Sequence, residues 1–139
     1  MSNWIVAGLI AGVVAWLVDW LMWGKIFTKG MELFMMNMSP EEMKKFMPQA
    51  MVKSFLMALL FGVIVACFYG RFRSDLWVQP GGPIAGMEFG AVLWLPTIAL
   101  STLGSGIWYI KARPLQMATF WAWLARLLAS GLVVGLLMK

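Results

Sequence analysis

The chain has 139 residues, of which 62% are hydrophobic and only 12% charged, and its formal net charge is +5. A mean hydropathy of +0.82 excludes an ordinary water-soluble domain, which would need more polar surface. The chain has no histidine, which removes the usual ligand of haem, zinc and copper and excludes a Ser-His-Asp site. We therefore expect a membrane protein that is no enzyme and carries no cofactor. Its basic charge indicates topology and contact with lipid headgroups, not nucleic acid.

Four apolar stretches approach or exceed the roughly 20 residues that cross a hydrocarbon core about 30 Å thick. They predict membrane-spanning helices over residues 4–23, 51–69, 83–105 and 115–138. The first stretch ends in tryptophans and Lys25, as at a membrane interface, and this pattern favours a permanent helix over a cleaved signal. The predicted fold is all-α, a single transmembrane four-helix bundle over residues 1–139.

The connection between the first two spans is amphipathic, and we expect an interfacial segment over residues 30–49. Within it, the sequence Ser39-Pro40-Glu41-Glu42 is typical of a helix start, with an N-cap serine, proline at the first position and acids in the first turn. The pattern predicts two short interfacial helices, broken between residues 37 and 40.

Seven of the 13 methionines lie between Met31 and Met51, in this connection and at the start of span two, and Met43, Met47 and Met51 share one helical face. Thioethers suit Cu(I), so copper, lipid and protein are three alternative partners for this face. Flexible apolar filler at a membrane or partner surface is preferred, and no metal site is predicted. The single cysteine, Cys67, lies in the second span, where we expect a small apolar core residue.

Lysines and arginines of the short connections predict the orientation, because cytoplasmic loops carry an excess of them. The first and third connections, with the start of span two, hold Lys25, Lys29, Lys44, Lys45, Lys53, Lys111 and Arg113, whereas the opposite side holds Arg71, Arg73 and Lys139. This bias places the first and third connections in the cytoplasm and both termini outside.

Small residues at four-residue spacing recur in every span, and in lipid such patterns let helix backbones approach closely. The predicted helix-packing glycines are Gly8, Gly12, Gly62, Gly86, Gly90, Gly131 and Gly135. Together they predict tight helix contacts, within one chain or between subunits.

The glycines also belong to segments of similar sequence within the chain. Gly8, Gly12 and Trp16 match Gly86, Gly90 and Trp94 at one fixed offset, and the segments around Gly62 and Gly131 are faintly similar. Either the similarity arose by chance, or the chain is a parallel two-plus-two repeat. If it is a repeat, we expect spans one and three at equivalent places in the centre, with Asp19 matched by Thr97.

Arg126 lies in the middle of the last span, where an unpaired charge is costly, so we expect it to be paired. Asp19 and Glu88 are the only acids inside the other apolar runs, and depth and side-chain direction favour Asp19. Lys53 lies at a depth similar to that of Asp19. These four residues form the predicted intramembrane polar cluster, next to a predicted backbone kink at Pro96.

The cluster has two interpretations. The preferred one is an ion pair that sets the helix register, assisted by stacking of Arg126 on Trp123 or another tryptophan. The other is a polar site for a substrate, ion or proton, with Asp19 as the titratable group. Accordingly, the predicted function is an accessory or scaffold subunit or a helix-packing homo-oligomer, with membrane lipids, other membrane subunits or further copies as partners. A small transporter or channel is the alternative, and a lipid, quinone or carotenoid binder is the third.

The order of features resembles a family of small bacterial four-span proteins catalogued as domain of unknown function 1761. The resemblance rests on Trp20 to Lys25, the long amphipathic connection, Leu95-Pro96-Thr97 and the hinge from Lys111 to Leu115. It implies a multi-pass protein of the bacterial inner membrane and no known chemistry. With the charge bias described above, both termini would be periplasmic. The chain is also similar in size to small multidrug-resistance transporters, but Asp19 near the end of its span and Arg126 depart from their pattern.

Overall fold

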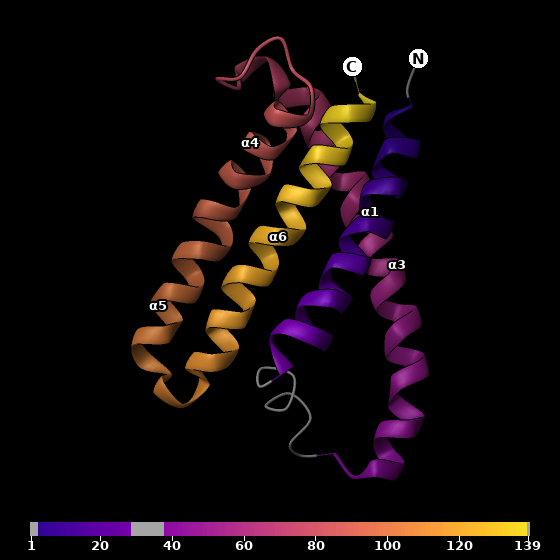
Figure 1. Ribbon diagram of the computed structural model, residues 1–139, viewed down its shortest axis with the longest axis vertical. Helices are drawn as coiled ribbons and strands as arrows, with labels where there is room; N and C mark the ends of the chain where they lie inside the picture. Colours follow the sequence, from indigo (N-terminus) through magenta and orange to yellow (C-terminus); the bar gives the residue numbers. More distant parts are fainter. Residues whose placement is uncertain (1–2, 29–37, 139) are drawn as a thin grey trace.

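A computed structural model describes residues 3–28 and 38–138, and this part of the chain is helical and contains no strand (Figure 1). Several helices join end to end through short π-helical or 3-10 turns. The elements in chain order are α1 (Trp4–Leu21), η1 (Met22–Ile26), α3 (Pro40–Phe72), η2 (Arg73–Asp75), α4 (Pro83–Trp94), η3 (Leu95–Ala99), α5 (Leu100–Trp108), η4 (Ile110–Ala112) and α6 (Arg113–Leu137).

Four helical stretches of the described chain are long and apolar enough to cross a membrane: Trp4–Ile26, Pro40–Asp75, Pro83–Trp108 and Ile110–Leu137. They confirm the predicted all-α four-helix architecture. Trp77 precedes the third stretch and is 90% exposed, and Trp108 at its far end is 83% exposed. Exposed tryptophans at both ends of a span are typical of the two membrane interfaces.

Helix α3 begins as predicted and continues further than predicted. The Ser39 hydroxyl accepts from the Glu42 backbone N–H, and a Glu42 carboxylate oxygen accepts from the Ser39 N–H, both at 3.2 Å. The expected separate short helix after Pro40 is wrong, because α3 runs through Pro48 to Phe72 without a break. A proline inside a helix removes one hydrogen bond, and in such long apolar helices this loss does not end the helix. Of the predicted interfacial segment, residues 30–37 lie outside the described part.

Two helix pairs form the bundle, and glycines bring each pair together. Gly8 and Gly12 of α1 pack on the α3 backbone, where a Cβ on Gly8 would lie 2.9 Å from the Gly62 carbonyl oxygen. Gly86 and Gly90 of α4 meet the α6 backbone in the same way. Along α6 the matching contacts come from Gly131 and Gly135. The predicted helix-packing residues therefore lie at both contacts.

The contacts of the two pairs correspond residue by residue. If Gly62 is aligned with Gly131, then Ala58, whose carbonyl faces Gly12, aligns with Leu127, whose carbonyl faces Gly90. The two pairs therefore pack in one common register, as a repeat would require.

The two matched tryptophans also make related hydrogen bonds. The Trp94 indole N–H donates to the Phe120 carbonyl at 3.0 Å. The Trp16 indole N–H reaches the corresponding carbonyl, that of Met51, through the Ser54 hydroxyl, with links of 3.0 and 2.9 Å. The two pairs thus share one hydrogen-bonding plan.

The pairs join asymmetrically. α1 packs along α6, α3 touches α6 across the middle of the bundle, and α3 and α4 hardly meet (Figure 1). The expectation that spans one and three lie at the centre is therefore wrong. Spans one and four, α1 and α6, make the main contact between the pairs instead, so α3 and α4 lie on the outer sides.

Candidate functional site

Arg126 and Asp19 form the ion pair that the sequence predicts. A guanidinium nitrogen of Arg126 donates to an Asp19 carboxylate oxygen at 2.6 Å, and the two side chains are 12% and 27% exposed. Arg126 lies near the middle of α6, and Asp19 lies in the last turn of α1 before the π-helical turn η1. The pair therefore connects α1 to α6 at one defined register.

Two aromatic rings stack on the same guanidinium. Its central carbon lies 4.3 Å from the ring centroid of Phe61 and 4.5 Å from that of Trp123. The rings meet each other edge to face, with centroids 5.8 Å apart. Such contacts stabilise a desolvated cation by up to about 2 kcal/mol. Stacking on Trp123 was predicted, whereas stacking on Phe61 was not. Phe61 precedes the packing glycine Gly62 in the sequence, and this position was the one indication that it lies near another helix.

Two buried polar atoms of α6 lack a hydrogen-bond partner among the described residues. They are Arg126 Nε and the hydroxyl of Ser130, which is completely buried one turn further along α6. Unsatisfied buried groups are rare and are often explained by an ordered water or a functional role. Sequence reasoning missed Ser130, although its four-residue spacing from Arg126 places both on one face of the helix.

The other predicted members of the polar cluster lie elsewhere. Glu88 accepts hydrogen bonds from the backbone N–H groups of Trp77 and Val78, at 2.7 and 2.8 Å. Its carboxylate thus fixes the loop before α4, because the backbone N–H groups of this tight connection need a hydrogen-bond acceptor. Lys53 is exposed on α3. Within residues 3–28 and 38–138, the Asp19–Arg126 contact is the only ion pair, so inclusion of Glu88 and Lys53 in the cluster was wrong.

Pro96 distorts the third span as predicted. It lies in the π-helical turn η3 between α4 and α5, and the Thr97 hydroxyl donates to the Leu93 carbonyl at 2.5 Å. Proline lacks an N–H and clashes with the preceding turn, which favours a local widening of the helix. The turn lies beside an apolar groove of about 170 Å³, whose lining includes Thr97 and Trp123.

No protein-family model matches the chain, and no significant match to a curated protein or a solved structure was found. The resemblance to the small four-span bacterial family stays a prediction.

The described residues bring together no cluster of three histidine, cysteine, aspartate or glutamate side chains that could hold a metal ion. Cys67 is exposed, so its expected place in the core is wrong. Met43, Met47 and Met51 do lie along one face of α3, where each is partly buried. The site's chemistry is that of one cation and one anion in mutual contact, surrounded by aromatic rings.

Proposed function

We propose that the protein is an accessory or scaffold subunit of the bacterial inner membrane, acting through helix contacts with other subunits or with copies of itself. The observation that carries this proposal is the ion pair of Arg126 with Asp19, in which the guanidinium also stacks on Phe61 and Trp123 of its own chain. A charge that is paired within its own chain sets helix register.

The outer surface supports the same role. Large apolar side chains are exposed along the helices, among them Leu17, Leu56, Leu60 and Leu103. Lipid accounts for such faces in any membrane protein, and other transmembrane helices also pack on them when small residues allow close approach.

A second candidate function, a small transporter or channel, is favoured by the unpartnered Arg126 Nε and Ser130 hydroxyl. A proton, ion or small anion would find two polar atoms there, next to a carboxylate that is 27% exposed. The two candidates lead to opposite results in one experiment.

The experiment replaces the pair by neutral side chains of similar shape, Asp19→Asn with Arg126→Gln. The scaffold role predicts that the mass and composition of the native complex, measured by native mass spectrometry, are those of the wild type. It also predicts that proteoliposomes of either protein dissipate a pH gradient no faster than empty vesicles. A flux through the wild type that is lost in the double variant, with assembly unchanged, would establish the transporter and overturn the scaffold.

A further inference from the structure

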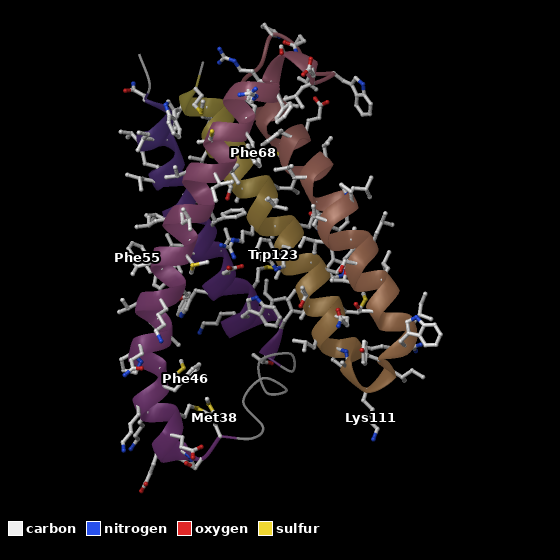
Figure 2. All side chains as sticks on the ribbon, turned by 180° about the vertical axis from the view of Figure 1, so that it is seen from behind. Met38, Phe46, Phe55, Phe68, Lys111 and Trp123 are labelled. Atoms are coloured by element: carbon white, nitrogen blue, oxygen red, sulfur yellow. The ribbon has the colours of Figure 1, made fainter. Side chains whose placement is uncertain are left out.

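A groove opens on one face of the bundle between α3 and the third span. Phe61, Val65 and Phe68 of α3 form one wall and Leu93 and Thr97 the other, and Trp123 of α6 lies at its floor. Figure 2 shows Phe68 and Trp123 on this face, with α6 visible between α3 and α4. The groove holds about 170 Å³ and is almost entirely apolar.

The repeat explains why the groove is open. The contact between α3 and α4 is the counterpart of the contact between α1 and α6, which is closed. At the closed contact, Ala15 and Ser130 are completely buried. Their counterparts at the groove are Leu93 and Phe61, which are much larger. Bulky side chains therefore hold α3 and α4 apart where small ones let α1 and α6 meet, and the groove is a built feature of the fold.

The dimensions of the groove select its occupant. A transmembrane helix is about 10 Å across with its side chains and does not fit. An apolar cavity of about 150 Å³ takes a molecule the size of benzene, so the groove suits one narrow hydrocarbon chain. A polar ligand finds no free donor at Thr97, because its hydroxyl already donates to the Leu93 carbonyl.

A positive charge lies in line with the groove. Ile64, Phe68 and Arg71 follow each other at four- and three-residue spacing, which places them along one face of α3. Arg71 is exposed, and it forms no ion pair with any residue that the structure describes. The rise from Phe61 to Arg71 is about 15 Å. This equals half of a hydrocarbon core about 30 Å thick, the depth that one leaflet's acyl chain occupies.

We propose that this groove is a binding site for an anionic phospholipid, with one acyl chain between α3 and α4 and its phosphate on Arg71. The acyl chain would end at Phe61 and Trp123, whose rings also contact Arg126. The lipid would therefore cover the ion pair on the membrane side. The site goes beyond the scaffold role and does not depend on it.

The test uses the full-length protein in nanodiscs that contain phosphatidylglycerol with a photoactivatable group near the acyl-chain end. After irradiation, we expect labels, assigned to single residues by tandem mass spectrometry, on Phe61, Val65, Leu93 and Trp123 in preference to outward-facing residues such as Leu17 and Leu60. Ile64 lines the groove, whereas Leu60, one turn earlier on α3, is exposed outside it. Ile64→Trp is expected to lower groove labelling about tenfold, because the indole fills the space that the acyl chain would occupy. The matched Leu60→Trp variant is expected to leave it unchanged.

A second variant tests the headgroup. Arg71→Gln is expected to reduce the preference for phosphatidylglycerol over phosphatidylcholine about fivefold, in line with about 1 kcal/mol per basic residue near an anionic headgroup. Uniform labelling of all lipid-facing helices would mean an annular lipid only and would overturn the proposal. Loss of a homo-oligomer in Ile64→Trp, with unchanged lipid labelling, would assign the groove to a second copy instead and would equally overturn it.

Discussion

Arg126 places a fixed positive charge in the middle of a largely apolar helix, and its neighbours stabilise that charge. Asp19 supplies an anion at 2.6 Å, and Phe61 and Trp123 supply aromatic faces. Removing one partner of a buried pair leaves the other charge without compensation, whereas removing both partners costs much less. The pair is therefore tested best by comparing single with double substitutions.

We predict that Asp19→Ala lowers the free energy of unfolding by about 3 kcal/mol, because it leaves the guanidinium unpaired. Asp19→Leu together with Arg126→Leu should cost far less than this, since no buried charge remains. Reversible unfolding in mixed detergent, followed by circular dichroism, measures both values. Lys53→Ala is the control and should change stability by less than about 0.5 kcal/mol, as expected at an exposed position. Equal losses in the single and double variants would show that Asp19 does not neutralise Arg126.

At the scale of the elements, glycines decide which helices pair. Gly62 and Gly131 occupy matching places in α3 and α6, where a side chain would meet the backbone of α1 and α4 respectively. Without a hydrophobic force between helices in lipid, close backbone approach is the main source of their association. A methyl group at either glycine must separate the helices along the whole pair.

We therefore expect Gly62→Ala and Gly131→Ala to destabilise the protein by similar amounts, about 1–3 kcal/mol or more, as overpacked sites do. Gly104→Ala is the matched control: it is also helical, has nothing within 4 Å of the added Cβ, and should be neutral or slightly stabilising. Thermal unfolding in detergent measures all three. A loss at Gly104 as large as at Gly62 would show that alanine is costly without a backbone contact, and would contradict close packing as the cause at Gly62.

At the scale of the whole molecule, charge differs between the two ends of the bundle. Both described ends of the chain lie beside the connection from α3 to α4, as Figure 1 shows. The opposite end holds the start of α3 and Lys111, which Figure 2 labels. Because basic residues are more numerous at the latter end, the positive-inside rule predicts that this end faces the cytoplasm.

Reporter fusions test this orientation. We expect alkaline phosphatase fused at the C-terminus to be active and green fluorescent protein there to be dark, because both reporters would be periplasmic. Fusions that end after Lys111 should show the reverse pattern, measured as enzyme activity and whole-cell fluorescence. An inactive phosphatase and a bright fluorescent protein at the C-terminus would show that the orientation is the reverse. The proposed phospholipid would then lie in the cytoplasmic leaflet.

Much of this architecture could be predicted from the residues alone. Apolar length specifies spans whatever their neighbours are, because every backbone group in lipid must bond within its own helix. Scarcity of charge identified the partner of Arg126, since few acids lie at membrane depth. Local chemistry was predictable too: Ser39 caps α3, and Pro96 lies in a π-helical turn.

Other features depended on contacts between distant segments. Glu88 holds a loop, Phe61 stacks on Arg126, and spans one and four make the main contact between the helix pairs. Periodicity shows which faces of a helix are small or apolar, but not which helix they meet, because in lipid one apolar face resembles another. The spans, the glycine faces and the Asp19–Arg126 pair were thus determined by the sequence by itself. The closed contact of α1 with α6 and the open groove between α3 and α4 were decided by the tertiary structure, since side-chain volume acts only once the helices meet.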